Sequence, residues 1–109
     1  MIEIIALLDK NGVIRDCKVS GHAKAGKAGN DIVCAAVSVL VRTAVNVLSN
    51  RKGITIHYNA LEKGQLYMEV SYEAEGKDFL YAAGVFLIEG LKSVAQEYPK
   101  NCTLTVKEI

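Results

Sequence analysis

The sequence predicts one α+β domain, in which five strands form a mixed or antiparallel sheet packed against two helices in the order ββαββαβ. Short runs of alternating apolar and polar residues predict the strands, and two long segments with apolar residues at helical spacing predict the helices. The length of 109 residues suffices for one core but not for two. We therefore expect residues 1–109 to form a single domain.

The first two strands are expected at residues 2–8 and 13–20, joined as a hairpin. The segment DKNG at 9–12 is typical of a hairpin turn in which Gly12 adopts positive φ. Alternation in the second strand places three apolar residues on its core face: Val13, Cys17 and Val19. Arg15 interrupts that face.

The first helix is expected from about Asp31 to Ser49, with Asn30 or Asp31 capping its free amide groups. One apolar stripe is expected to face the core: Val33, Val37, Leu40, Ala44, Val47 and Leu48. A second face has smaller residues: Ile32, Ala36, Val39 and Thr43. Apolar residues on two sides indicate a helix covered both by its own sheet and by another element or subunit.

A second hairpin is expected from strands at 53–59 and 64–72 across the turn ALEK, and a last strand at 102–109. The second helix is expected from about Asp78 to Tyr98, before Pro99. Its core face has six members: Leu80, Gly84, Leu87, Leu91, Val94 and Tyr98. Because glycine lowers helix stability by about 1 kcal/mol relative to alanine, the two glycines at 84 and 90 indicate close packing.

Composition excludes several classes of protein. Lys and Arg (13) nearly balance Asp and Glu (12), so we expect no direct nucleic-acid binding. The longest apolar stretches are interrupted by polar residues, which excludes a membrane span, and the first residues lack the pattern of a signal peptide. We therefore expect a cytoplasmic protein. Three widely spaced cysteines without a C-x-x-C pair predict neither a disulfide framework nor a zinc site, and no metal or cofactor is expected.

The stretch GHAKAGKAGNDIVCAAVS at 21–38 partly fits a phosphate-binding loop. Gly21, Gly26 and Lys27 match that pattern, but Ala28 replaces the Ser or Thr that would bind magnesium. The expected helix also begins about four residues after the lysine rather than at it. The chain is too short for a parallel nucleotide-binding sheet, so we reject this interpretation.

The same stretch also fits a cysteine active site. If Asp31 caps the helix, Cys34 lies in the first turn, where unpaired amides and the helix dipole favour a thiolate. Asp31, Cys34 and Ser38 share one helical stripe that lies off the core face. His22 precedes Cys34 by twelve residues across a loop with Gly26 and Gly29, which can bring imidazole to sulfur.

A structural role for Cys34 is the competing interpretation, because a cysteine among Ala and Val is usually a small buried hydrophobic residue. Cys17 and Cys102 are expected to be structural, and His57 to be a surface residue of a polar strand face. From residue types and spacing, both interpretations of Cys34 stay open.

The stretch at 21–38 and a later segment at 89–99 resemble a known protein family. GHA at 21–23 with GNDIVCAAVS at 29–38, and EGLKSVAQEYP at 89–99, resemble the ribosomal-processing cysteine protease family known as Prp over essentially the whole chain. The resemblance implies a homodimeric bacterial cysteine protease without a cofactor. Its implied substrate is the short N-terminal extension of a large-subunit ribosomal protein.

Site roles follow from the resemblance by direct match. His22 would be the general base and Cys34 the nucleophile, with Asp31 and Ser38 in support. Gly21 and Gly29 would be backbone hinges of a mobile loop over 21–30, and first-turn amides near Cys34 would stabilise the oxyanion. No third residue is assigned to orient His22.

The alternative function is a non-catalytic ribosome-associated binding module or a dimerisation module that keeps the motif for packing. For a dimer, the face around Ile32, Ala36 and Val39 and the helix with Gly84 and Gly90 are both candidate surfaces.

Overall fold

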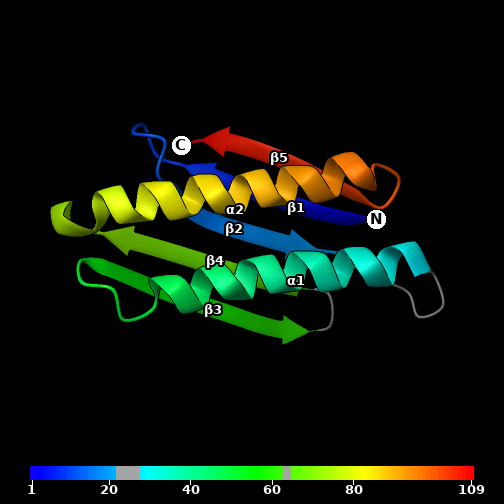
Figure 1. The fold of residues 1–109 in the computed structure, drawn as a ribbon, viewed down its shortest axis with the longest axis horizontal. Helices are drawn as coiled ribbons and strands as arrows, with labels where there is room; N and C mark the ends of the chain where they lie inside the picture. The colour runs from blue at the N-terminus through cyan, green and yellow to red at the C-terminus, as the bar shows by residue number, and fades with distance from the viewer. Residues whose placement is uncertain (22–27, 63–64) are drawn as a thin grey trace.

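The computed structural model describes residues 1–21, 28–62 and 65–109 and, within these ranges, the backbone alone of residues 28–31 and 61–62. Its elements are β1 (Ile2–Leu8), β2 (Ile14–Ser20), α1 (Ala28–Leu48), β3 (Ile54–Glu62), β4 (Gln65–Tyr72), a short 3₁₀ turn (Ala74–Gly76), α2 (Lys77–Glu97) and β5 (Cys102–Glu108). The predicted α+β class and the order ββαββαβ are confirmed. Figure 1 shows the two helices side by side over the sheet.

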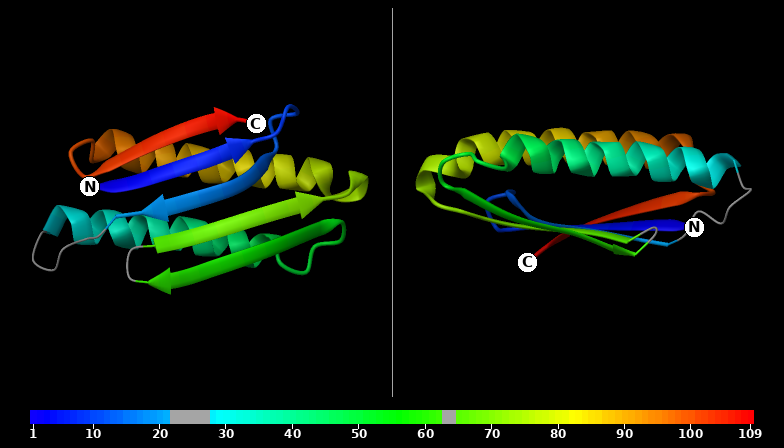
Figure 2. Two further views of the ribbon diagram at one scale, coloured as in Figure 1. Left: turned by 180° about the vertical axis from the view of Figure 1, so that it is seen from behind. Right: turned by 90° about the horizontal axis from the view of Figure 1, so that it is seen from below.

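The five strands form one mixed sheet in the order β3-β4-β2-β1-β5. β1 and β5 are parallel, with Ile2 opposite Cys102, and the other neighbouring pairs are antiparallel. Both helices cover the same face of the sheet and leave the other face bare (Figure 2). The core therefore lies between one sheet face and the helix pair, where Ile4, Met68 and Leu91 are almost fully buried.

Strand β2 contains a β-bulge, so its residues do not alternate regularly as expected. Leu7 pairs with Asp16 and Leu8 with Ile14, so Arg15 is the extra residue between two paired positions. The bulge allows Ile14 to be buried in the core, and the Arg15 Nε donates a hydrogen bond to the Val70 carbonyl at 3.2 Å. Arg15 therefore does not interrupt the apolar face.

Helix α1 begins at Ala28, three residues before the expected start at Asp31. Asn30 and Asp31 therefore lie inside the helix, and neither is its cap. Alanine has the highest helix propensity and one glycine costs only about 1 kcal/mol, so Ala28 and Gly29 can extend the helix beyond the apolar pattern used to predict its start.

The buried stripe of α1 also differs from the expected one. Its buried members are Val33, Val37, Val41, Val45 and Leu48. The expected core residues Leu40, Ala44 and Val47 instead line a groove between α1 and α2. The α1 side chains that face the sheet are therefore mostly four residues apart. The later members of the predicted stripe lie beside α2 instead.

Helix α2 matches its predicted bounds within one residue, and the expected close packing at its glycines is confirmed. A Cβ atom at Gly84 would lie 2.9 Å from Ile14 Cγ2, and one at Gly90 would lie 3.0 Å from Leu40 Cδ2. Both glycines therefore serve contacts within the chain. Since these contacts explain them, neither glycine indicates a dimer surface.

The second hairpin has a longer first strand than expected. β3 extends to Glu62, so residues 60–62 of the expected turn belong to the strand, with an irregularity in register between Asn59 and Glu62. Neither of the described helices has an apolar stretch long enough to cross a membrane.

Candidate active site

A small pocket of about 90 Å³ lies where the start of β1, the end of β2, the start of β4 and the first half of α1 meet. Its walls come from four elements or their ends: Ile2, Val19, Gly21, Cys34, Val37, Ser38 and Leu66. Most of these side chains are apolar, whereas Cys34 and Ser38 contribute a thiol and a hydroxyl. The pocket therefore combines a thiol and a hydroxyl with an apolar surface.

Gly21 follows β2 directly and has a backbone conformation that excludes other residues. Its φ is +108°, and a Cβ atom there would lie 2.2 Å from the Met1 carbonyl oxygen. Glycine adopts positive φ without a steric penalty, and its missing side chain leaves room for the neighbouring backbone. Close packing of the first residues against the end of β2 therefore requires glycine at this wall of the pocket.

Cys34 and Ser38 are four residues apart on α1 and face the same pocket. Both are partly exposed, whereas Val33 and Val37 beside them are buried. Cys34 and Ser38 therefore share a stripe that is less buried than the core face, as expected, whereas the side chain of the third expected member, Asp31, is not described. Cys34 packs against the core with part of its surface and is open to the pocket with the rest.

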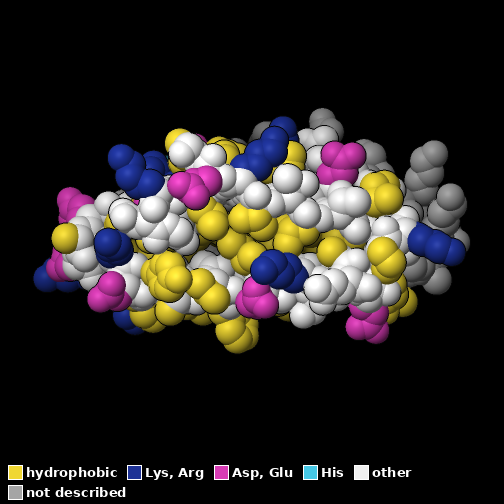
Figure 3. Space-filling view, turned by 90° about the horizontal axis from the view of Figure 1, so that it is seen from above, with side chains coloured by type: hydrophobic (Ala, Val, Ile, Leu, Met, Phe, Trp, Pro, Cys, Tyr) yellow, Lys and Arg dark blue, Asp and Glu magenta, His cyan; other side chains and the backbone are white. Residues whose placement is uncertain are grey.

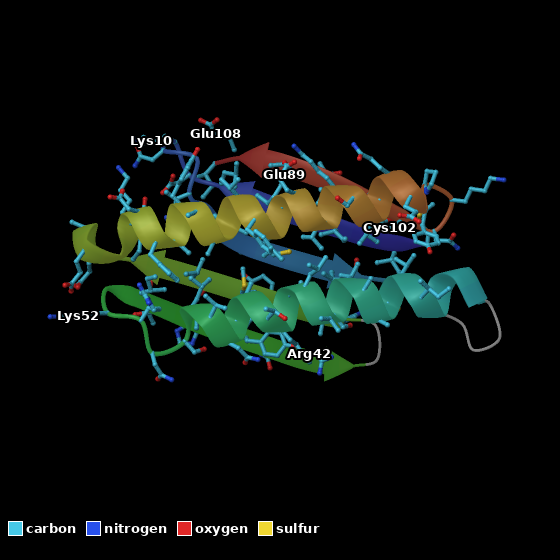
Figure 4. The ribbon with its side chains drawn as sticks, in the orientation of Figure 1. Lys10, Arg42, Lys52, Glu89, Cys102 and Glu108 are labelled. Carbon is cyan, nitrogen blue, oxygen red and sulfur yellow. The ribbon has the colours of Figure 1, made fainter. Side chains whose placement is uncertain are left out.

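The other two thiols are buried, whereas Cys34 is partly exposed. Cys17 is fully buried, and burial, with the charge of Asp16, raises the pKa of its thiol to about 12. Burial also raises the pKa of Cys102, and the charge of a Cys34 thiolate raises it further. Cys102 lies at the end of the sheet nearest the start of α1 (Figure 4). Both cysteines are buried, which agrees with the structural role predicted for them.

The earlier start of α1 corrects two expectations. Amides without an intrahelical partner belong to the first four residues of a helix, here 28–31, so Cys34 lies in the second turn and not in the first. The expectation that Cys34 lies among the unpaired amides of the first turn is therefore wrong. The helix also begins directly after Lys27, which removes one objection to a phosphate loop. Ala28 still offers no oxygen for a metal, and the sheet is not a parallel nucleotide-binding sheet.

The structure brings together Gly21, Cys34 and Ser38 among the predicted site residues. His22 lies outside the described residues, as do Gly26 and both lysines of the loop, Lys24 and Lys27.

The remaining candidates lie on helix and strand elements. Gly29 was expected in the loop over 21–30, but it lies with Asp31 in the first turn of α1. The side chain of Asp31 is not described. His57 is exposed on β3, as predicted.

Sequence reasoning missed the apolar walls of the pocket. Ile2, Val19 and Leu66 come from three different strands. Alternation predicts that Val19 faces the core, and the turn at 9–12 predicts that β1 and β2 are neighbours, but no local signal shows that β4 lies beside β2, because that pairing joins strands distant in sequence. Within the ranges 1–21, 28–62 and 65–109, no group of three or more His, Cys, Asp or Glu side chains could hold a metal ion.

Comparison with known proteins gives a consistent result at the level of sequence. A family model described as cysteine protease Prp matches residues 1–103. The ribosomal processing cysteine protease Prp of Staphylococcus aureus is 25% identical over 107 residues, which cover 98% of this chain and 100% of that protein.

Solved structures agree on the fold. The SMU.848 protein of Streptococcus mutans has a TM-score of 0.80 at 26% identity, covering 100% of this chain and 96% of the other. The Staphylococcus aureus protease Prp, in a structure described as an essential ribosomal processing protease with a substrate peptide, has a TM-score of 0.82 at 23% identity, covering 98% and 100%. At that identity the second likeness establishes the fold.

Proposed function

The chain belongs to the family of the cysteine protease Prp, and we propose that it removes a short N-terminal extension from a large-subunit ribosomal protein. The observation that supports this most directly is the position of Cys34. Its thiol is the most open of the three cysteines and faces a pocket whose wall includes Gly21, the residue before His22. The reaction would take place in the cytoplasm, where ribosomes are assembled.

The proposed reaction is acyl transfer to Cys34. His22, as general base, takes the thiol proton, and the Cys34 sulfur attacks the scissile carbonyl carbon to form a tetrahedral intermediate. His22 then protonates the leaving amine as the peptide bond breaks, which leaves a thioester on Cys34. Water activated by His22 hydrolyses the thioester and restores the thiol.

The supporting residues act around this pair. The Ser38 hydroxyl faces the pocket one helical turn after Cys34, where it can donate a hydrogen bond to the bound peptide or to the sulfur. Asp31 lies in the first turn of α1. Gly21 and Gly29 lie on either side of residues 22–27, which are outside the described residues.

Stabilisation of the oxyanion has to come from groups other than the Cys34 amide, which lies inside α1. The helix N-terminus still favours negative charge in its neighbourhood, although this effect is largest in the first turn and weaker in the second. We therefore assign a modest part of the charge stabilisation to the helix.

We also propose that the protein is a homodimer, which the family resemblance implies. Exposed Ile32 and Val39 on α1 are consistent with a helix covered by a second subunit, since they are 51% and 53% exposed in the single chain.

A cleavage assay tests the protease proposal. The substrate is a peptide with the N-terminal extension of the ribosomal protein and the first residues of its mature sequence. We expect wild-type protein to cut it once and Cys34→Ser or Cys34→Ala to lower kcat/KM by about 1,000-fold or more, because the nucleophile is lost. Mass spectrometry of the products measures both rate and cleavage site.

Cys102→Ala is the matched control, because it removes a buried thiol near the pocket without removing the proposed nucleophile. Its activity should stay within a few fold of wild type in a chain that melts cooperatively. Binding of an intact peptide by wild-type protein would instead support the non-catalytic binding module.

A further inference from the structure

Cys34 and Cys102 have one neighbour in common, which is Ile2. Ile2 lines the pocket that Cys34 faces, and it lies opposite Cys102 in the parallel pairing of β1 with β5. Neighbouring strands are about 4.8 Å apart, and the side chains of Ile2 and Cys102 are both buried in the core. A single side chain therefore adjoins both thiols.

Two further observations show that the thiols are close. Cys34 packs with part of its surface against the buried cluster to which Cys102 belongs. Burial, and then the charge of a Cys34 thiolate, raise the pKa of Cys102, as a like charge does at short range. Both thiols are free in this structure. The pair therefore holds two reduced sulfur atoms on elements that are far apart in sequence.

The two thiols differ in how solvent reaches them. Cys34 is partly exposed and faces a pocket of about 90 Å³, which is room for hydrogen peroxide, since a water molecule takes about 30 Å³. Cys102 is only 2% exposed at the start of β5, and Figure 3 shows apolar side chains gathered along the edge formed by β5 and α2. A small oxidant therefore meets Cys34 before Cys102.

We propose that Cys34 and Cys102 form a reversible disulfide when the protein meets hydrogen peroxide. Closing the bond requires a Cα separation of about 4.4–6.8 Å, which sets how closely the second turn of α1 has to approach the start of β5. Disulfides in cytosolic proteins are usually transient and redox-sensing. Formation of the bond does not depend on proteolysis, whereas the loss of activity that it causes rests on the proposed role of Cys34 as nucleophile.

The reaction has two steps. The Cys34 thiolate first attacks one oxygen of hydrogen peroxide, and as the O–O bond breaks it becomes a sulfenic acid, while the other oxygen leaves as hydroxide and takes a proton. The Cys102 sulfur then attacks the Cys34 sulfur, so that the S–S bond forms as the S–O bond breaks. The hydroxide that leaves takes the Cys102 proton. Two thiols and one peroxide thus give one disulfide and two water molecules.

The charge on Cys34 sets the order of these steps. While Cys34 is a thiolate, its charge adds to burial in raising the pKa of Cys102, which keeps Cys102 a thiol. The sulfenic acid is neutral, so oxidation of Cys34 removes this influence and favours the Cys102 thiolate that attacks it. The disulfide then protects Cys34 from further oxidation to a sulfinic acid, which added thiols do not reverse.

Mass spectrometry of the full chain after treatment with equimolar hydrogen peroxide tests the proposal. We expect wild type to lose the mass of two hydrogen atoms, and a non-reducing digest to contain one peptide pair joined through Cys34 and Cys102. The rate of peptide cleavage should fall by about 10-fold or more, because the sulfur of the nucleophile is blocked. Dithiothreitol should restore both the mass and the rate.

Cys102→Ala removes the second thiol and should change the outcome of oxidation. Peroxide should add oxygen to Cys34 in this variant, and dithiothreitol should not restore the rate once the sulfinic acid has formed. Cys17→Ala is the matched control, because Cys17 is an equally buried thiol on β2 that the reaction does not use. It should form the disulfide like wild type. Thermal melts show that both variants fold.

The remaining outcomes separate this inference from the proposed function. A wild-type chain whose mass stays unchanged, that only gains oxygen, or that forms a disulfide through Cys17 or between two chains overturns the inference. Equal recovery of wild type and Cys102→Ala with dithiothreitol overturns it as well. A disulfide between Cys34 and Cys102 in a chain that does not cut the ribosomal peptide supports the oxidation site and counts against the protease proposal alone.

Discussion

The two ends of β1 are fixed in different ways. At its C-terminal end, Asp9 accepts hydrogen bonds at Oδ1 from the Asn11 and Val13 amides, at 2.8 and 3.1 Å, and at Oδ2 from the Tyr72 hydroxyl. At its N-terminal end, about 20 Å away along the strand, Ile2 lines the pocket with Cys34. One end is held by a carboxylate with several donors, and the other by backbone packed against a glycine.

The C-terminal end of β1 stabilises the fold, whereas its N-terminal end forms part of the candidate active site. The turn end uses its polar groups in hydrogen bonds that fix the hairpin and join it to β4. The pocket end keeps a thiol and a hydroxyl facing a hollow, and its geometry depends on the absence of a side chain at Gly21. We therefore expect changes at the pocket end to affect activity most, and changes at the turn end to affect stability alone.

Gly21→Ala should have the largest effect. The new Cβ would lie 2.2 Å from the Met1 carbonyl oxygen, at a φ of +108° that alanine rarely adopts. The start of β1 has to move, which displaces Ile2 from the pocket wall. We expect a loss of about 3 kcal/mol or more in the free energy of unfolding, and loss of peptide cleavage beyond that explained by unfolding.

Gly12→Ala is the matched variant at the turn end. Gly12 also has positive φ, at +78°, but a Cβ there would meet Tyr81 Cε1 at 3.4 Å, an ordinary contact. The cost should be confined to backbone strain of about 1–2 kcal/mol, with cleavage by the folded fraction unchanged. Equal losses of activity in the two variants would contradict the separation. Chemical denaturation and cleavage rates measure the two quantities.

The sequence predicts more of the structure at the turn end of β1 than at its pocket end. The turn at 9–12 and the positive φ of Gly12 follow from four consecutive residues, and both are confirmed. Alternation and helical spacing predict every strand and both helices, because these signals are local. The contact of Tyr72 with Asp9 joins residues 63 positions apart, and no local pattern contains it.

At the site, the motif predicts which residues of α1 face the pocket but not the pocket itself. Cys34 and Ser38 share a stripe because helix geometry requires it, whereas the walls from β1 and β4 depend on strand order. The predicted start of α1 is wrong because capping residues also occur inside helices. The pairing of His22 with Cys34 stays a prediction.

Asp9→Asn should have an intermediate effect on stability. Burial, the largest influence, raises the pKa of Asp9, but the hydrogen bonds from Tyr72, Val13 and Asn11 and the charge of Arg15 together lower it below its usual value. A lowered pKa in the folded state means that the carboxylate stabilises the protein above the unfolded-state pKa, and that this stability is lost as pH falls through the folded-state pKa.

We therefore expect Asp9→Asn to cost about 1 kcal/mol at pH 7, a value reduced by solvent screening, and to differ less from wild type below about pH 4. Urea denaturation at pH 7 and pH 3 measures the difference. Peptide cleavage should be unchanged, because the substitution is at the opposite end of β1 from Cys34. A destabilisation that grows toward low pH would contradict the proposed role of the charge.

Asp16→Asn should have the smallest effect, with the opposite sign. Asp16 lies opposite Glu69 in the β2–β4 register. Burial and then the charge of Glu69 raise its pKa, against the opposing charge of Arg15. A raised pKa in the folded state means that the carboxylate destabilises the fold as pH rises through the unfolded-state pKa toward neutrality. Removing the charge should stabilise the protein at pH 7 by about 0.2–1 kcal/mol and change little near pH 3.

Asp78→Asn is the control for Asp16→Asn, because Asp78 is an exposed carboxylate in the first turn of α2, where the helix dipole favours negative charge. It should lower stability slightly at pH 7, so the two substitutions, chemically identical, should shift the urea midpoint in opposite directions. A shift in the same direction for both would mean that net charge, and not the carboxylate pair between β2 and β4, governs the response. Cleavage should be unaffected in either variant, since both positions lie away from the pocket that holds Cys34.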